Sequence, residues 1–388
     1  MYRKFLLTGW SIFALLFTFP VLAQQKATKQ PRHTSTPPAT SKSKASLATA
    51  SAAETPAVPF GKGMEYGLLR VWAPYDFIPG NKVVFQEDLT GEDKGEFPAH
   101  WEQLKGQLEV ATYGSSNTLN LQEKGTSIRP LLLEENWLPD TAAIEMDLLF
   151  ETDDPNTKYK LYLLSDAAAY KEAQHGAYAH PIEVTATGIK FSDADSVSAA
   201  LQQAGTRYQW RHISIRTSKG QLDAYLDQYH LLHLTNVKGK PAGLRIEVDK
   251  RGEANTMVRN VLVSGGAPQL PAQLHTNGRI VTPGIRFEYN TATMRPESAG
   301  TLHTLLQLLQ EQPALKLSIE GHTGNNGDQN LNMDMSRKQA EAVKAYLVYQ
   351  GIAPARLVAK GWGSTKPLDK SSSAKADWNN YRLEFIKL

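Results

Sequence analysis

The sequence predicts an all-β sandwich domain followed by an α+β domain with the element order β-α-β-α-β-β. Three observations support this prediction. Between about residues 82 and 266, apolar and polar residues alternate with a period of two, which is typical of half-buried strands. From about residue 280, the apolar residues instead follow the spacing of amphipathic helices. Between the two stretches, Gly265-Gly266-Ala267-Pro268 interrupts both patterns and indicates a boundary.

The first 23 residues have the parts of a secretory signal peptide. Arg3 and Lys4 precede an apolar run, and Val21-Leu22-Ala23 resembles a small-residue cleavage site. An N-terminal membrane anchor is the alternative, because the run approaches the length of a spanning helix. Pro20 favours cleavage, since it breaks a helix just before that site. Both interpretations predict export across the inner membrane.

Two further segments precede the predicted sandwich. Residues 24–59 are rich in Ala, Ser, Thr, Pro and Lys, so they are predicted to be a disordered linker. Residues 60–81 turn apolar and aromatic, and we expect them to form an arm that packs onto the next domain. We therefore divide the rest of the chain into the sandwich at 82–266, a hinge at 267–279 and the α+β domain at 280–388.

Charge and cysteine content exclude several functions. Arg3 and Lys4 contribute +2 and residues 24–59 contribute +4 to a net charge of +3, so the remainder carries −3. Nucleic-acid binding by the folded body therefore has no support. The chain has no cysteine, which excludes disulfides, thiolate metal sites and a cysteine nucleophile.

Six apolar sets in the sandwich segment alternate as strands do. They are Ile144, Met146, Leu148 and Phe150; Tyr159, Leu161 and Leu163; Ile213 and Ile215; Leu222, Ala224 and Leu226; Leu244, Ile246 and Val248; and Val261 and Val263. The hairpin from Trp210 to Asp227, with its turn at Lys219-Gly220, resembles the laminin-G/concanavalin-like jelly roll. That resemblance implies a domain that binds a glycan or a protein partner, in some members with calcium.

The sandwich segment offers two kinds of candidate binding residue. Trp101, Trp137 and Trp210 are either stacking platforms for a sugar or parts of the core and its rim. Asp153-Asp154 and Asp193-Ala194-Asp195 are either calcium ligands or solvated turns. We assign no metal site, no cofactor and no catalytic residue, because the sequence shows no Ser/His/Asp, paired-histidine or phosphate-loop constellation.

The C-terminal segment is predicted element by element. A helix begins at Pro296-Glu297-Ser298, and a second ends at Gly351. Strands are predicted at Leu317 to Glu320, Leu357 to Trp362 and Tyr381 to Ile386. The buried positions of the two helices are Leu302, Leu305, Leu306 and Leu309, and Ala340, Val343 and Leu347.

Residues from about 280 to 388 resemble the OmpA-like domain of Gram-negative envelopes. The motifs that carry the resemblance are Ile285-Arg286-Phe287-Glu288-Tyr289-Asn290, Ile319-Glu320-Gly321-His322-Thr323, Met335-Ser336, Gly351-Ile352, Gly361-Trp362-Gly363, Pro367 and Asn380-Tyr381-Arg382-Leu383-Glu384. With its sandwich partner, this domain is also similar to envelope proteins common in Bacteroidetes.

The resemblance implies a pocket that binds the diaminopimelate end of the peptidoglycan stem without covalent chemistry. In the family, an Asp after Gly-His-Thr meets the ligand's ammonium and an Arg of the next helix meets its carboxylate. Here Gly324 and Gln339 stand in those places. Losing both charge-assisted bonds would weaken binding by roughly two to four orders of magnitude. The predicted ligand-binding residues are Asn290, Thr323, Gly324, Asn325, Asn332, Gln339, Tyr381 and Arg382.

The loop from Gly321 to Gly327 also leads into a helix N-terminus, where backbone N–H groups suit a small anion. Compensation for the missing pair by Asn325, Asn326 or Tyr381, or recognition of a different stem peptide, are the alternatives at this site. The sequence lacks the two charged partners, and we predict that the loop keeps the backbone geometry of the family.

These observations predict a non-enzymatic envelope protein, exported to the periplasm or associated with the outer membrane, that associates with peptidoglycan weakly or atypically. The alternative is a sandwich module that binds a glycan or protein, with the OmpA-like domain as scaffold or dimer surface. A glycan-active enzyme is a third class, and it lacks an identifiable carboxylate pair.

Overall fold

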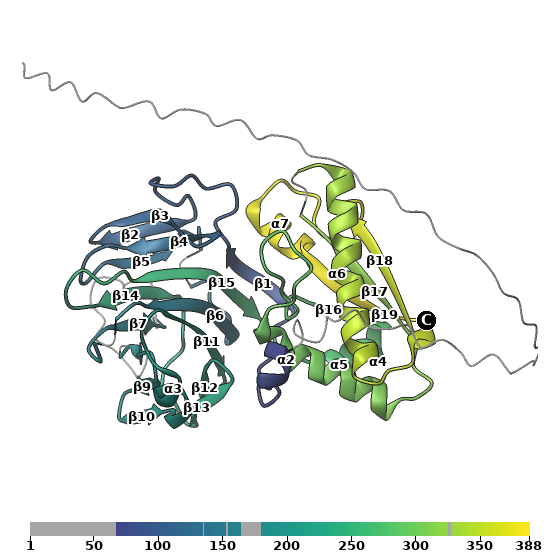
Figure 1. Ribbon diagram of the computed structural model, residues 1–388, viewed down its shortest axis with the longest axis horizontal. Coiled ribbons are helices and arrows are strands. Elements are labelled where there is room, and N and C mark those ends of the chain that lie inside the picture. The colour runs from purple at the N-terminus through teal and green to yellow at the C-terminus, as the bar shows by residue number, and fades with distance from the viewer. Residues whose placement is uncertain (1–66, 135, 153, 164–179, 325–326) are drawn as a thin grey trace, which may run out of the picture. The chain divides into compact units, whose positions relative to one another are not determined.

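The structure is a computed structural model that describes residues 67–134, 136–152, 154–163, 180–324 and 327–388. The predicted signal peptide, the predicted linker and the start of the predicted arm lie outside the described residues, as do Asp153, Asn325 and Asn326. Figure 1 colours the described elements from the N-terminal to the C-terminal end of the chain. Within the described residues, no helix is both long and apolar enough to span a bilayer.

Two antiparallel sheets build the N-terminal domain. The first has the order β13-β12-β11-β6-β15-β4-β3, and β1 also pairs with β15. Its strands are β1 (Lys82–Glu87), β3 (Leu108–Tyr113), β4 (Ser116–Leu121), β6 (Thr141–Phe150), β11 (Gln209–Ser218), β12 (Gln221–Leu226), β13 (Tyr229–Leu234) and β15 (Met257–Gly265).

The second sheet has the order β10-β9-β8-β7-β14-β5-β2. Its strands are β2 (Trp101–Lys105), β5 (Ser127–Pro130), β7 (Lys158–Tyr162), β8 (Ile182–Val184), β9 (Gly188–Phe191), β10 (Ala194–Val197) and β14 (Arg245–Asp249). A short helix, α3 (Ala199–Ala204), precedes β11. Both sheets contribute to one buried apolar cluster, so the two layers are sandwich-like.

The predicted period of two is confirmed in these strands. Buried and partly exposed residues alternate along β7 and β14, as expected for strands with one face on a core. Lys219 and Gly220 both have positive φ, 46° and 80°, which is the backbone of a tight two-residue hairpin turn. Strand β6 differs, because Glu145 and Asp147 on its second face are only 2% and 4% exposed.

The C-terminal domain has a four-stranded sheet of order β16-β19-β17-β18, in which only the β17–β18 pair is parallel. The strands are β16 (Arg279–Thr282), β17 (Leu317–His322), β18 (Leu357–Gly363) and β19 (Arg382–Lys387). The helices are α4 (Leu270–Asn277), α5 (Ala299–Glu311), α6 (Gln329–Tyr349) and α7 (Ala374–Asn380), with 3₁₀ turns at η3 (Pro296–Ser298) and η4 (Pro354–Arg356). The predicted β-α-β-α-β-β order is therefore present, with α4 and α7 in addition.

Helix α4 lies in the segment that the sequence predicted as a hinge. Its Leu270 and Leu274 are buried with the core of the C-terminal domain, so this segment is packed. The helix has Pro271 at its first turn and ends at Gly278, whose φ is 66°. Eight residues with polar His and Thr gave too short an apolar pattern to predict it.

Helix α6 packs closely on β17 and β18 (Figure 1). Two glycines allow this approach. A Cβ on Gly321 would lie 2.2 Å from the carbonyl oxygen of Ser336, and one on Gly361 would lie 2.3 Å from the backbone nitrogen of Arg337. The glycines of the Gly-His-Thr and Gly-Trp-Gly motifs therefore bring the helix backbone against the sheet.

The described part of the predicted arm contacts both domains. It begins with α2 (Gly67–Val71), and Leu69, Trp72, Tyr75 and Phe77 are buried in the same cluster as the core of the C-terminal domain. The hydroxyl of Tyr75 lies 2.6 Å from Oγ of Ser214 on the outer face of β11. The prediction of an arm on the sandwich alone was thus incomplete, because the arm also completes the second core.

A buried ionic cluster connects the two domains. Asp147 accepts hydrogen bonds from Arg295 at 2.7 Å, from His212 Nδ1 at 2.9 Å and from Asn260 at 2.7 Å. Arg295, just before η3, also pairs with Glu297. Asp147, on the acidic face of β6, is therefore covered by the C-terminal domain.

Candidate functional site

The loop after β17 leads into α6, whose N-terminus is capped by the chain itself. The carboxylate of Asp328 accepts hydrogen bonds from the backbone N–H groups of Asn330 and Leu331, at 2.8 and 2.9 Å. An N-cap carboxylate satisfies amides and compensates the positive helix end that an external anion would otherwise meet. The predicted anion site at this helix end is therefore taken in part by Asp328.

Gln339, at the arginine position of the family motif, connects three segments. It is 3% exposed, and its Nε2 donates to the hydroxyl of Tyr381 at 2.8 Å and to the carbonyl of Thr291 at 3.0 Å. The structure thus brings together two predicted ligand residues, Gln339 and Tyr381, beside the turn that holds Asn290. Asn290 is exposed, with φ 51°.

The side chain of Tyr381 is covered at its hydroxyl and partly exposed elsewhere. The residue is 36% exposed overall, whereas its hydroxyl lies against buried Gln339. Burial of that hydroxyl raises the pKa of Tyr381 to about 12, and the hydrogen bond with Gln339 opposes the rise. At neutral pH Gln339 and Tyr381 are therefore a neutral pair, and Gln339 stands at the position of the family's arginine.

Arg382 is held by its own domain. Its guanidinium donates to the carboxylate of Glu384 at 2.7 Å and to the carbonyls of Asn380 and Lys366 at 2.9 and 3.2 Å. The side chain is buried, and burial lowers the pKa of Arg382. This geometry stabilises the closing strand, so Arg382 does not present a free fork to a ligand.

Three predicted residues lie around the loop itself. The N–H of Thr323 donates to the carbonyl of Gly363 at 3.0 Å, and its hydroxyl donates to the carbonyl of Gly324 at 3.1 Å. Asn332 is half-buried in the first turn of α6. Asn325 lies outside the described residues. The loop is therefore fixed to β18 at its start.

A carboxylate from another element lies beside Gly324. A Cβ on Gly324 would be 3.5 Å from Oδ1 and 3.6 Å from Cγ of Asp377, which is half-buried on α7. Gly324 has no positive φ, so the backbone itself does not require glycine there. Because an aspartate side chain extends only about two C–C bonds beyond Cα, a carboxylate at 324 and that of Asp377 would share one place. Sequence reasoning missed Asp377, which is far from the loop along the chain.

His322, at the end of β17, is buried and uncharged. Burial is the main cause that lowers the pKa of His322 to about 4, and Arg382 adds to it. Neither ring nitrogen has a hydrogen-bond partner within the described residues. A histidine at this strand end is expected from the sequence to form a hydrogen bond rather than to act as a catalyst or ligand, and His322 does not form that bond.

The tryptophans of the sandwich are not exposed platforms. Trp101 and Trp137 are 1% and 7% exposed and belong to the core. Trp210 is partly buried, and the guanidinium of Arg259 lies 4.1 Å from its ring centroid. Of the two interpretations of these residues, the structure favours core and rim.

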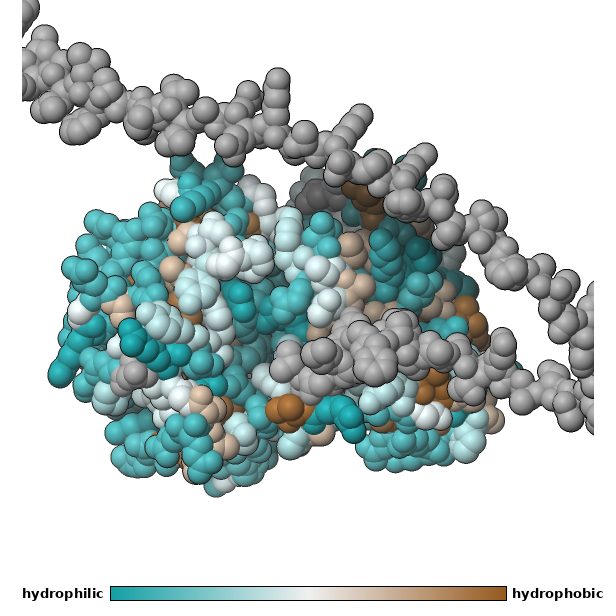
Figure 2. All heavy atoms as spheres, in the orientation of Figure 1, coloured by the Kyte–Doolittle hydropathy of each residue, from teal (hydrophilic) through white to brown (hydrophobic). Residues whose placement is uncertain are grey.

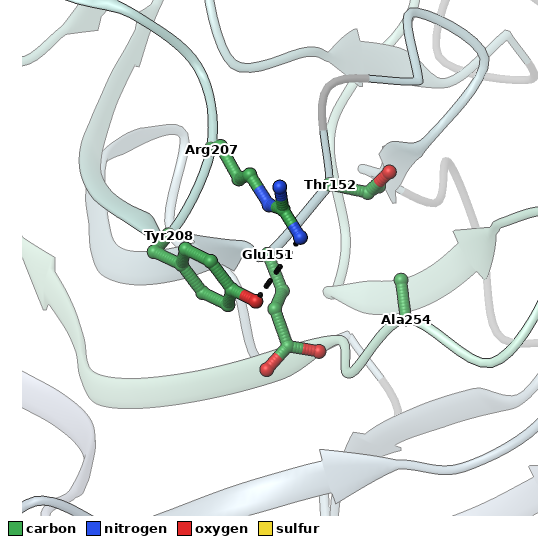
Figure 3. Close-up of a pocket in the computed structure, with 5 residues that line it drawn as sticks. All are labelled: Glu151, Thr152, Arg207, Tyr208 and Ala254. Carbon is green, nitrogen blue, oxygen red and sulfur yellow. Dashed lines mark hydrogen bonds between the residues drawn. The ribbon is translucent and has the colours of Figure 1, made fainter.

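Two open pockets lie on the sandwich. One, of about 370 Å³, is lined by Glu151, Thr152, Arg207, Tyr208 and Ala254. Figure 3 shows the guanidinium of Arg207 beside the hydroxyl of Tyr208, which it meets at 3.3 Å. The other, of about 350 Å³, includes Asp154 and Asp195 in its lining. Within the described residues, neither aspartate belongs to a group of three metal-type ligands.

The similarity of this chain to known proteins lies in its C-terminal part. Residues 286–381 match the model of the OmpA family. "Probable lipoprotein YiaD" of Escherichia coli K12 is 31% identical over 100 residues, which cover 26% of this chain and 46% of that protein. "Peptidoglycan-associated lipoprotein" of Pseudomonas aeruginosa is 31% identical over 101 residues, covering 26% and 60%. "Peptidoglycan-binding protein ArfA" of Mycobacterium tuberculosis is 29% identical over 137 residues, covering 34% and 42%.

Among solved structures, the peptidoglycan-associated lipoprotein from Burkholderia pseudomallei aligns with a TM-score of 0.26 and 23% identity, over 27% of this chain and 88% of that one. The chain spans 46% of the length of YiaD and 60% of the Pseudomonas lipoprotein. The family match and the strand order both fall on the C-terminal sheet and its helices. Residues 286–381 therefore form an OmpA-like domain, which follows a domain of sandwich-like sheets.

Proposed function

We propose that this chain is a non-enzymatic protein of the bacterial envelope that binds the peptide stem of peptidoglycan through its OmpA-like domain. The support is the match of residues 286–381, together with relatives whose names describe peptidoglycan association or binding. The signal peptide predicted at residues 1–23 supports export to the periplasm or the outer membrane.

In this proposal, Asp377 supplies the carboxylate that the family has at position 324. The stem ligand ends in an ammonium and a carboxylate on one carbon, and a half-buried carboxylate beside the loop suits the ammonium. The observation that carries the proposal is the 3.5 Å separation between Asp377 Oδ1 and the Cβ position of Gly324. Thr323, Gly324 and Asn332 would surround that end of the ligand, and the predicted ligand residue Asn325 lies outside the described residues.

The other half of the ligand meets neutral groups. Gln339 lies where the family would place an arginine, with Tyr381 and Asn290 beside it, and a neutral donor forms a bond about half as strong as a charge-assisted one. Arg382 is left out of the ligand set, because Glu384 and two carbonyls hold its guanidinium. Binding is therefore atypical, with one charged contact instead of two.

A sacculus pull-down with the whole chain tests this proposal. We expect retention of the wild type and a loss of roughly ten- to hundredfold in affinity for Asp377→Asn, the value of one charge-assisted bond. Gly324→Asp alone would place two carboxylates together and would bind poorly, because like charges repel. Combined with Asp377→Asn, the same substitution should restore retention.

Asp369→Asn is the matched control, since Asp369 is an exposed carboxylate on the segment that leads into α7. Gln339→Arg should strengthen retention by restoring the family's cation. If the wild type is not retained, peptidoglycan binding is rejected. If the wild type and Asp377→Asn are retained equally, the role of Asp377 alone is rejected.

For the sandwich, we propose the laminin-G/concanavalin-like jelly-roll type. The Trp210–Asp227 hairpin supports this, because it forms β11 and β12 and because Asp227 accepts from the N–H of His212 at 2.8 Å and pairs with Arg211. Recognition of a glycan or protein by this domain is the alternative function. With the tryptophans in the core and rim, no contact among the described residues favours it over the first proposal.

A further inference from the structure

Three side chains with metal-ligating atoms gather on the β12–β13 hairpin. Oδ1 of Asp223 lies 3.1 Å from Nε2 of His230 and 2.7 Å from Nδ1 of His233. All three ligand atoms lie within 4.8 Å of one another. In the part of the chain that the structure describes, this is the one group of three such side chains with that spacing.

A β-bulge brings the two histidines to the same face. In a regular strand, residues three apart point to opposite faces. Here Asp223 pairs with His233 and Tyr225 pairs with His230, and the register shifts between Ala224 and Tyr225. The bulge leaves Leu231 without a partner opposite it and turns His230 outward, beside Asp223.

The distances fit a tetrahedral ion. Metal–ligand bonds of about 2.0–2.2 Å place two ligands of a tetrahedron about 3.3 Å apart. The two Asp223–His separations are slightly shorter, so small side-chain rotations would admit an ion. Two imidazoles and one carboxylate, with a fourth position open, suit zinc and its late first-row neighbours rather than magnesium or calcium.

The surroundings hold the ligands and leave them accessible. The ring of His230 stacks on Tyr225, with centroids 4.2 Å apart and 4° between the planes, and Tyr225 donates to Asp76 at 2.9 Å. His230 and His233 are 39% and 61% exposed. Across the sheet, Asp223 pairs with Arg216, whose guanidinium donates to the carbonyl of Ile78 at 3.0 Å.

We propose that Asp223, His230 and His233 form a zinc-class metal site on the β12–β13 hairpin at the edge of the first sheet, separate from the proposed peptidoglycan site. The three-residue set and the bulge that assembles it carry this proposal, whether or not the chain binds peptidoglycan. Without metal, the two histidines share the carboxylate of Asp223 through hydrogen bonds. With metal, the same atoms become ligands and a fourth position remains for water or for a donor from another molecule.

Titration of the untagged whole chain with ZnCl₂, followed by calorimetry, tests the site. We expect saturable binding of one zinc per chain. His230→Ala and His233→Ala should each weaken binding at least about tenfold, since even a lost outer-shell partner costs that much. His275→Ala, which removes an exposed histidine on α4, should leave the affinity unchanged. MgCl₂ in excess should not compete.

CoCl₂ gives a test that needs no variant. Visible absorption typical of four-coordinate cobalt should appear with the wild type and disappear when zinc is added.

Because His233 is an exposed residue, His233→Ala should remain folded, and far-UV circular dichroism checks this. No saturable zinc binding, unchanged affinity in His233→Ala, or displacement by magnesium would each overturn the proposal.

Discussion

The charge of Asp147 is balanced by groups from both domains. Burial alone would raise its pKa, but Arg295 and His212 outweigh burial, so the pKa of Asp147 lies well below its usual value. Burial likewise opposes the charge on His212, yet Glu297, Asp147 and Glu145 raise the pKa of His212 to about 10. The cluster is thus fully ionised at neutral pH.

Asp147→Asn should destabilise the chain by about 3–5 kcal/mol, because it removes one buried anion from Arg295 and His212 and leaves Glu297 to balance Arg295. Chemical denaturation of both proteins measures the change. Asp140→Asn is the control, since Asp140 and its partner Lys240 are 69% and 67% exposed and such a pair contributes little. A loss below about 1 kcal/mol for Asp147→Asn would contradict the interpretation of the cluster.

Stability should also depend on pH through His212. A group whose folded pKa is raised contributes stability that is fully present below its unfolded pKa and lost as pH rises to its folded one. Between about pH 6.5 and 10, the wild type should therefore lose up to about 1 kcal/mol per pH unit relative to His212→Gln. Urea midpoints across that range give the slopes, and parallel slopes would refute the assignment.

At acidic pH, the carboxylates of the cluster change the stability in the opposite direction. The pKa values of Asp147 and Glu297 are lowered, since their cationic neighbours outweigh burial. Their contribution is present above the ordinary carboxyl pKa and is lost as pH falls through the lowered values. The cluster therefore stabilises the chain most at mildly acidic pH.

Single residues also mark where sequence reasoning ended. The replacement of the family's Asp and Arg by Gly324 and Gln339 could be read directly from the sequence. The approach of Asp377 to Gly324 was not, because it depends on how α7 packs. Glu145 and Asp147 alternate with apolar residues as a solvated face would, and only the position of Arg295 shows that this face is buried.

Elements with a long apolar period were predictable, and short or irregular ones were not. The predicted stripe of Leu302, Leu305, Leu306 and Leu309 identified α5, and all of these residues are fully buried except Leu306, which is partly buried. Helix α7 has seven residues and mostly polar side chains, too few for a periodic signal. The His230–His233 spacing is also misleading in the sequence. Residues three apart in a regular strand lie on opposite faces, but here a bulge changes the face on which one of the two residues lies.

At the level of elements, the contact between α6 and the sheet depends on the missing side chain of Gly321. Gly321→Ala would place a Cβ against the carbonyl oxygen of Ser336, so we expect a loss of about 1–3 kcal/mol through overpacking. Thermal unfolding is the measurement. Gly324→Ala, in the same loop, meets only ordinary contacts of 3.4 Å and more and should cost far less. Equal losses would argue against close packing as the cause.

At the scale of the whole molecule, the sandwich positions part of the proposed ligand site. Trp378, next to Asp377, packs on the sandwich core, with its ring 5.3 Å from that of Phe85. The face of the sandwich seen in Figure 2 is mainly hydrophilic, with scattered apolar residues. Helix α7 is therefore held by both domains, and the carboxylate it carries depends on the first.

Trp378→Ala should weaken retention on sacculi although Trp378 is not assigned to the ligand site. We expect a loss of about two- to thirtyfold, corresponding to a coupling of about 0.5–2 kcal/mol. Tyr208→Ala, which removes an exposed aromatic ring of the sandwich, serves as control. If retention is unchanged in Trp378→Ala while Asp377→Asn reduces it, the sandwich does not position α7.

The arm determines how mechanical force would pass through the chain. Along the covalent chain, tension applied at residue 67 and resisted at the OmpA-like domain would run through every strand of the sandwich. Leu69 and Phe77, however, are packed in the core of the OmpA-like domain, and Arg70 donates to Tyr349 of α6 at 3.3 Å. These contacts offer a shorter parallel route. Tension between residue 67 and the OmpA-like domain would therefore load the arm first and spare the sandwich until the arm detaches.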